Sequence, residues 1–148
     1  MEREEYMALA LELAREAAAD GDVPVGCVIA DREGNIIGRG RNRREADGDA
    51  TAHAELEAIR AACRQAGSWR LHGATLYVTL EPCPMCAGAI VNARIPAVYY
   101  GAKDDKAGCC GSVLNLFEER FNHHPRIYGR VLEAECAALL QEFFQSLR

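Results

Sequence analysis

The chain has 148 residues, of which 49% are apolar and 26% are charged, and its formal net charge is −5. The length predicts one domain spanning residues 1–148, and the composition is that of a soluble globular protein. The negative charge weighs against a nucleic acid partner, because proteins that bind phosphate usually carry a basic footprint. The basic residues are clustered, however, so their local distribution matters more than the total.

The sequence shows neither a membrane span nor a secretory signal. No apolar run approaches the length of a bilayer-crossing helix, and residues 1–5 do not resemble the start of a signal peptide. We therefore expect a cytoplasmic protein. Seven cysteines without a secretory segment do not indicate a disulfide framework. Cys27 and Cys136 have apolar neighbours and are expected to be buried, whereas Cys109 and Cys110, beside glycines, could be exposed and are expected to be reduced.

The elements alternate between helix and strand along most of the chain. Residues 2–19 have an apolar stripe at helical spacing and predict an amphipathic helix that ends at Gly21. Residues 27–30 and 36–40 predict a hairpin, and the polar residues 43–50 predict a loop. The remaining predicted elements are helix 52–66, strand 74–79, a helix from the C-x-x-C to residue 93, strand 97–101, helix 112–120, strand 126–128 and helix 132–147. This order predicts an α/β layered domain whose last two strands are parallel.

Two short motifs hold the residues with catalytic chemistry. Cys83 and Cys86 form a C-x-x-C preceded by Pro82, and His53 and Glu55 form an H-x-E further upstream. One imidazole and two thiolates are the three protein ligands that a catalytic zinc needs, since its fourth position is left to water. Glu55 is not required as a ligand. We predict that it moves protons instead, first as a general base and then as an acid.

The spacing of these motifs places the metal ligands at two helix N-termini. Cysteines three residues apart share one face of a helix, and Pro84 suits the first helical position because it has no N–H. A helix N-terminus also favours thiolates. The alternatives are a structural zinc or a redox C-x-x-C, and for Glu55 a carboxylate that only stabilises a helix start. An H-x-E upstream of P-C-x-x-C is typical of zinc deaminases.

With these motifs in place, the chain resembles the cytidine deaminase-like superfamily and, within it, the bacterial tRNA adenosine deaminases. The similarity extends over nearly the whole chain. The segments that carry it are 23–26 (VPVG), Asn42, 51–55 (TAHAE), 71–85, 101–104 (GAKD), 122–123 (NH), 135–140 (ECAALL) and 143–144 (FF). The metal motifs alone indicate the superfamily, while the Thr51-Ala52 lead-in, the Asn-His pair and the Phe-Phe tail indicate tRNA editing.

The resemblance implies a three-layer α/β/α cytidine deaminase-like fold around a five-stranded mixed sheet. It implies one Zn²⁺ per subunit, and a homodimer in which both subunits hold a tRNA anticodon loop and convert its wobble adenosine to inosine. It also implies His53, Cys83 and Cys86 as zinc ligands and Glu55 as the proton shuttle. The substrate-binding residues that it implies are Val25, Gly26, Asn42, Ala54, Glu81, Pro82, Asp104, Asn122 and His123.

In two places the chain departs from this family. His124 and Pro125 stand where the family usually has an arginine after Asn-His, and residues 145–148 are less basic than the usual tail. Both differences remove positive charge that would face phosphate. We therefore expect tRNA binding that is weaker, or less sensitive to salt, than is usual in the family.

Several residues near these motifs have more than one interpretation. Asn42 could bind the flipped nucleoside or could only shape a turn, and Asp104 could contact a nucleotide or could be a solvated loop residue. We expect one of Phe143 and Phe144 to lie in the core and the other to face RNA. Near Asn42 there is a basic run that could contact phosphates or form a solvated strand edge; it comprises Arg39, Arg41, Arg43 and Arg44.

Three functions are consistent with the sequence. An RNA-editing adenosine deaminase is favoured. A deaminase of free bases or nucleosides is the alternative, supported by the acidic balance and the less basic tail, and it predicts activity without tRNA. A non-enzymatic zinc-stabilised module is the third, and it predicts that replacing Glu55 by Gln has no effect on function.

Overall fold

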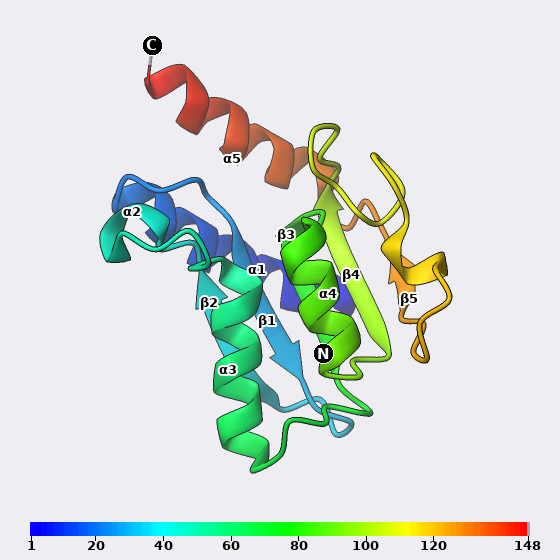
Figure 1. The fold of residues 1–148 in the computed structure, drawn as a ribbon. Coiled ribbons are helices and arrows are strands. Elements are labelled where there is room, and N and C mark those ends of the chain that lie inside the picture. The colour runs from blue at the N-terminus through cyan, green and yellow to red at the C-terminus, as the bar shows by residue number, and fades with distance from the viewer. Residues whose placement is uncertain (148) are drawn as a thin grey trace.

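A five-stranded mixed sheet is the framework of the computed structural model, which describes residues 1–147 (Figure 1). Its strands are β1 (Gly26–Ala30), β2 (Ile36–Arg41), β3 (Thr75–Leu80), β4 (Ala97–Ala102) and β5 (Arg126–Tyr128). They lie in the order β2-β1-β3-β4-β5. β1 is antiparallel to both of its neighbours, whereas β3, β4 and β5 are parallel to one another. The predicted mixed sheet with parallel final strands is confirmed.

Helices cover both faces of this sheet, which gives the expected α/β/α layers (Figure 1). The helices are α1 (Arg3–Ala19), α2 (Arg44–Asp47), α3 (Ala54–Ala66), α4 (Pro84–Asn92) and α5 (Glu133–Ser146), with a 3₁₀ turn, η1 (Leu116–Glu118). α3 and α4 lie on one face, and α1 and α5 lie on the other. No helix of residues 1–147 is both long enough and apolar enough to span a bilayer.

The core is divided by the sheet into two apolar layers. Cys27 and Ile29 of β1 pack into the layer beneath α3 and α4, while Val28 and Ala30 pack into the layer beneath α1. All of β1 is buried because successive side chains alternate between two covered faces. Cys27 is buried, as predicted, and so is Cys136 on α5.

Two predicted segments are wrong in their local structure. Residues 43–50 contain the short helix α2, which is stabilised by contacts distant in sequence, since the buried Asp22 carboxylate accepts a hydrogen bond from the Glu45 N–H (2.9 Å). The helix predicted over 112–120 is reduced to η1. The Ser112 N–H instead donates a hydrogen bond to the carboxylate of Glu81, which follows β3. Val113, which was expected to face inward, is 55% exposed.

The exposure considered for Cys109 and Cys110 is also wrong. Their side chains are 1% and 7% exposed, because the segment before η1 turns inward and the Cys109 N–H donates to the Pro82 carbonyl (2.8 Å). None of the seven cysteines forms a disulfide, so Cys109 and Cys110 are in the reduced state predicted for this pair.

Gly40 lets α3 approach β2 closely. A side chain at Gly40 would collide with the Ala54 carbonyl and lie 2.7 Å from the Ala58 nitrogen. We expect Gly40→Ala to lower the free energy of unfolding by about 2 kcal/mol or more, because backbone of α3 would have to move. Gly88→Ala is the matched control, since a methyl group there meets nothing within 4 Å and α4 should gain up to about 1 kcal/mol. Urea unfolding measures both, and equal effects would contradict this account of β2 and α3 packing.

Candidate active site

Three metal-ligating atoms converge where α3 and α4 begin. His53 is the residue before α3 and Cys83 the residue before α4, both with extended backbone, and Pro84 opens α4 so that Cys86 lies in its first turn. His53 Nδ1 is 3.7 Å from Cys83 Sγ and 3.6 Å from Cys86 Sγ, and all three atoms lie within 4.8 Å of one another. Ligands of a tetrahedral zinc are separated by about 3.6 Å, so this donor set fits the ion.

The three ligands also influence one another's protonation. Hydrogen bonds from Cys86 and then from His53 lower the pKa of Cys83 to about 4. The hydrogen bond to Cys83 raises the pKa of His53, and the hydrogen bond with Cys83 together with burial raises that of Cys86. The group therefore favours one thiolate already, and a bound cation would supply the charge that keeps both cysteines deprotonated.

Glu55 lies beside this group in the first turn of α3. Its side chain is 4% exposed, and burial raises the pKa of its carboxyl group to about 7. A carboxyl group with a pKa near neutrality can both accept and donate a proton at physiological pH. The position of Glu55 is therefore suited to proton transfer.

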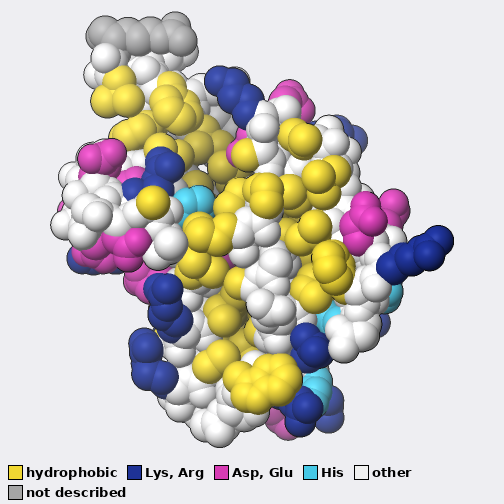
Figure 2. All heavy atoms as spheres, in the orientation of Figure 1, with side chains coloured by type: hydrophobic (Ala, Val, Ile, Leu, Met, Phe, Trp, Pro, Cys, Tyr) yellow, Lys and Arg dark blue, Asp and Glu magenta, His cyan; other side chains and the backbone are white. Residues whose placement is uncertain are grey.

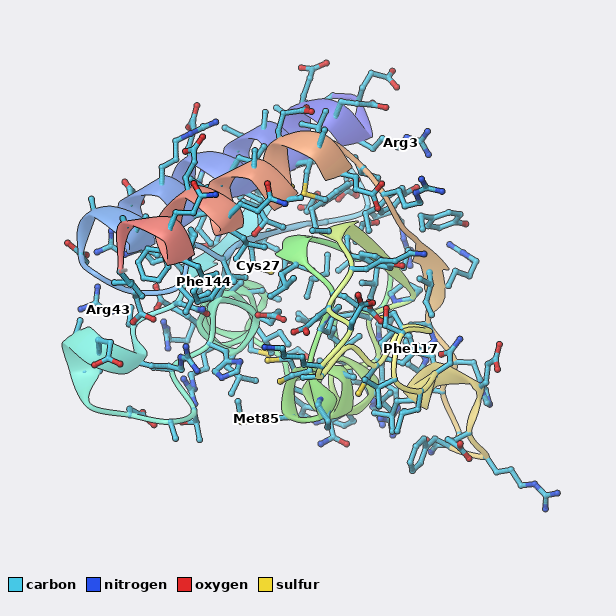
Figure 3. All side chains as sticks on the ribbon, turned by 90° about the horizontal axis from the view of Figure 1, so that it is seen from above. Arg3, Cys27, Arg43, Met85, Phe117 and Phe144 are labelled. Carbon is cyan, nitrogen blue, oxygen red and sulfur yellow. The ribbon has the colours of Figure 1, made fainter. Side chains whose placement is uncertain are left out.

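Both motifs face one cavity of about 540 Å³. It opens at the carboxyl ends of the parallel strands, where ligands usually bind in α/β sheets. The residues around it are Val23, Val25, Asn42, Arg44, His53, Glu55, Leu80, Glu81, Cys83, Lys103, Asp104, Asp105, Lys106, Ala107, Leu140 and Phe144. Figure 3 looks down on this end and shows Phe144 turned from α5 toward the start of α3. The volume suits a nucleoside-sized ligand.

Comparison with known proteins agrees with this geometry. Residues 1–102 match the cytidine and deoxycytidylate deaminase zinc-binding region. The tRNA-specific adenosine deaminase of Bacillus subtilis is 51% identical over 97% of this chain and 89% of its own length, and that of Agrobacterium fabrum is 47% identical over 99% and 97%. The chain belongs to this deaminase family.

A solved structure supports the same assignment. It comes from a study of A-to-I editing by tRNA:A34 deaminases at the wobble position, is 46% identical, and has a TM-score of 0.87 over 91% of this chain and 98% of that one. The protein is accordingly a zinc-dependent deaminase with the cytidine deaminase-like fold. His53, Cys83 and Cys86 provide a donor set that fits its zinc ion.

Not every residue expected at the substrate borders the cavity in the same way. Val25 lines it, whereas Gly26 packs against α1 and donates its N–H to Thr79 Oγ1 (3.2 Å). Asn42 lines it with a buried side chain. Its Oδ1 accepts from the Ala54 N–H (3.0 Å) and its Nδ2 donates to the Val23 carbonyl (3.1 Å). Asn42 thus secures the start of α3 and still has one lone pair and one N–H to offer.

Glu81, which follows β3, and Asp104, which follows β4, border the cavity, whereas Pro82 does not line it. Pro82 is buried and accepts the Cys109 N–H, and Glu81 is 2% exposed. Burial acts to raise the pKa of Glu81, but its hydrogen bonds with Ser112 and nearby backbone amides outweigh burial and lower it. The Asp104 carboxylate accepts from the Lys106 N–H (3.0 Å) and the Ala107 N–H (3.2 Å), so it shapes the turn that lines the cavity.

Asn122 and His123 are not brought to this cavity. His123 Nε2 donates to the Ile95 carbonyl (2.7 Å), which precedes β4, while the cavity lies at the opposite, carboxyl end of that strand. Within one chain the two residues therefore lie away from Glu55. The nucleotide contact expected of this pair is therefore not made inside this cavity by the same chain.

The basic run near Asn42 is partly occupied by ion pairs. Arg41 pairs with Asp20 (2.9 Å) and Arg43 with Asp47 (3.2 Å), while Arg39 is exposed and Arg44 borders the cavity. Lys103 and Lys106 also border the cavity, although neither was predicted as a site residue. Both residues follow β4 closely, at the end of the sheet where ligands bind, and this position could have identified them from the sequence.

Proposed function

We propose that the protein hydrolyses the 6-amino group of adenosine at the wobble position of a tRNA anticodon loop and leaves inosine. The observation that carries this function is that Glu55, His53 and Cys83 line one cavity, while the buried Cys86 completes the metal-binding group with His53 and Cys83. The relatives and the solved structure described above, similar over nearly the whole chain, are named for this activity.

The roles of the residues follow from their positions. His53, Cys83 and Cys86 would hold zinc, a Lewis acid that brings the pKa of water to about 7. Glu55 takes a proton from the attacking water and passes it to a ring nitrogen of adenine as the water oxygen bonds to C6. Glu55 then takes the remaining proton from the C6 hydroxyl and delivers it to the amine; as the C6–O double bond forms, the C6–N bond breaks and ammonia leaves. Its burial keeps this proton transfer away from bulk solvent.

The cavity must receive a base that has left its stack. In an anticodon loop the base is already unpaired, so moving it out of the stack costs little free energy. We assign Val25 and Asn42 to the walls around the base, and Asp104 to the neighbouring nucleotides. Phe144 is 46% exposed at the cavity and supplies a face on which a base can stack.

We further propose that the protein acts as a cytoplasmic homodimer. Exposed apolar side chains lie at the start of α4 and in the segment before η1, where Met85 is 36%, Val113 55% and Leu114 44% exposed. Figure 2 shows apolar surface spread over this side of the molecule. Such a patch on a soluble enzyme indicates an interface. A partner docked here could bring its own Asn122 and His123 to the substrate, which supports the expected shared site.

We expect the double variant Val113→Asp, Leu114→Asp to raise the dimer dissociation constant by about 100-fold or more, because each carboxylate would be buried without a partner. Sedimentation equilibrium measures this constant. Leu147→Asp is the control, since Leu147 is 67% exposed at the end of α5, outside this patch. A parent protein that is monomeric at micromolar concentration would refute the proposed dimer.

The function itself is tested with zinc-loaded protein and an anticodon stem-loop RNA that has adenosine at the wobble position. Inosine is expected there, and none in a stem-loop whose loop adenosine is moved to another position. Free adenosine, cytidine and guanine are the competing substrates. Ammonia from one of these, without inosine in the RNA, would assign the protein to the deaminases of small molecules. Binding to the RNA across a salt series would test the expected weaker or less salt-sensitive tRNA binding.

A further inference from the structure

One wall of the cavity is a loop whose cavity-facing half has no buried side chains. Residues 103–112 follow β4, and the first half, residues 103–107, borders the cavity. Lys103, Asp105 and Lys106 are exposed there, so this half buries little apolar surface. The second half contains the buried Cys109 and Cys110. Hydrogen bonds must therefore hold the cavity-facing half in place.

Both halves of the loop are bound to a single carboxylate, that of Glu81. Its Oε1 accepts hydrogen bonds from the Asp104 N–H (3.1 Å) and the Ser112 hydroxyl (2.5 Å). Its Oε2 accepts from the Cys110 N–H (2.9 Å) and the Ser112 N–H (3.1 Å). Gly108 closes over the carboxylate, and any side chain at this glycine would collide with it. The two ends of the loop are thus joined through one buried anion.

Glu81 is itself held rigidly. Its N–H donates to the Ala102 carbonyl (2.9 Å), and the next carbonyl, of Pro82, accepts from the Cys109 N–H (2.8 Å). The side chain is 2% exposed, with four donors around two oxygens. A carboxylate so occupied has little capacity left for a ligand.

We propose that Glu81 is a positioning residue, whose carboxylate fixes residues 103–112 as a wall of the cavity and so sets the affinity for substrate. It acts through the loop and does not touch the substrate. The choice of RNA as substrate in the test below rests on the proposed function, whereas amide exchange in the loop can be measured without any substrate.

Glu81→Gln separates the hydrogen bonds of the two carboxylate oxygens. If the amide oxygen takes the place of Oε2, the Cys110 and Ser112 N–H groups keep their acceptor, and the Ser112 hydroxyl can rotate to accept from the new NH₂ group. Only the Asp104 N–H then faces a donor. The opposite orientation would strand two N–H groups, so the first is preferred. The hydrogen bond that is lost is therefore that of Asp104, the residue that borders the cavity.

The experiment combines amide hydrogen exchange without substrate, zinc content, and steady-state kinetics with the stem-loop RNA. In Glu81→Gln we expect faster exchange at Asp104, slow exchange kept at Cys110 and Ser112, and the parent's zinc content. KM should rise about 10-fold, as the loss of one hydrogen bond to a charged acceptor would give, with kcat close to the parent's. Ser112→Ala, which removes one contact and leaves the backbone bonds, should give a smaller rise in KM.

Asp31→Asn is the matched control. The Asp31 carboxylate also accepts two backbone N–H groups, those of Glu33 (3.0 Å) and Asn35 (2.8 Å), but in the turn between β1 and β2. It should leave KM and exchange at Asp104 unchanged. Unchanged exchange at Asp104 in Glu81→Gln, or lower kcat with loss of zinc and no change in KM, would overturn the proposal. If the parent makes no inosine, the proposed function fails and the exchange result alone decides the role of Glu81.

Discussion

Glu55→Gln is expected to reduce inosine formation by about 10²- to 10⁴-fold, the range that general acid–base catalysis usually contributes. Glutamine has nearly the same shape and fits the buried position in the first turn of α3, but it cannot take a proton from water and pass it on. The carboxyl group of Glu55 is suited to this transfer because burial raises its pKa to about 7. Single-turnover inosine formation in the stem-loop RNA measures the effect, with zinc content determined on the same samples.

Glu57→Gln is a matched control for this prediction. Glu57 is also an acidic residue of the first turn of α3, and burial raises its pKa too, but it is only partly buried, does not line the cavity and interacts electrostatically with Arg43 and Arg41. Its replacement should leave the rate near the parent's. A Glu55→Gln enzyme that forms inosine at the parent's rate would instead favour a zinc-stabilised module without this chemistry, or a different proton carrier.

The residues of the metal group could be predicted from the sequence because their arrangement is local. His53 and Cys83 each precede a helix whose start is visible in the sequence, and Cys86 lies one turn further on. Two helix starts that bear ligands of one metal must meet. The layers of the fold follow in the same way from the alternation of helices and strands.

The sequence could not show contacts that depend on the assembled fold. Ser112 opens a pattern that is helical in its apolar spacing, yet its N–H and hydroxyl bind Glu81, a residue far away in the chain. In the same way Asp22 binds the Glu45 N–H and stabilises a helix that no local periodicity indicates. A carboxylate that binds distant backbone can override local propensity, because a buried N–H must find an acceptor.

The position of the Asn122–His123 pair has a different cause, because it follows from the parallel pairing of the last two strands, which the sequence does predict. Its residues were placed at the substrate by resemblance, but which end of β4 they reach depends on the direction in which the chain returns to β5. The chain returns to the end opposite the cavity, because β5 runs parallel to β4 and must begin beside its start. Ala97 is paired with Arg126, and His123 lies just before that pair. Parallel pairing therefore separates these residues from Glu55 of the same subunit.

Cys86→Ala is expected to abolish zinc binding and, with it, inosine formation. Cys86 is 0% exposed and its Sγ lies 3.6 Å from His53 Nδ1, so no solvent-exposed side chain can easily replace it. Two protein ligands would remain where a catalytic zinc site needs three. Atomic emission should find close to no zinc in the variant. Cys136→Ala, which removes another buried thiol from the opposite face of the sheet, should keep the parent's zinc content.

Loss of zinc should also lower the thermal stability of the protein, because the zinc ligands come from the starts of two helices. His53 belongs to the start of α3, while Cys83 and Cys86 belong to the start of α4, so a metal that binds the folded chain stabilises the contact between these helices. A chelator should therefore lower the thermal midpoint of the parent and of Cys136→Ala, and added zinc should restore both. Cys86→Ala should respond to neither addition. A chelator-sensitive midpoint in Cys86→Ala would mean that the zinc is held by a different set of residues.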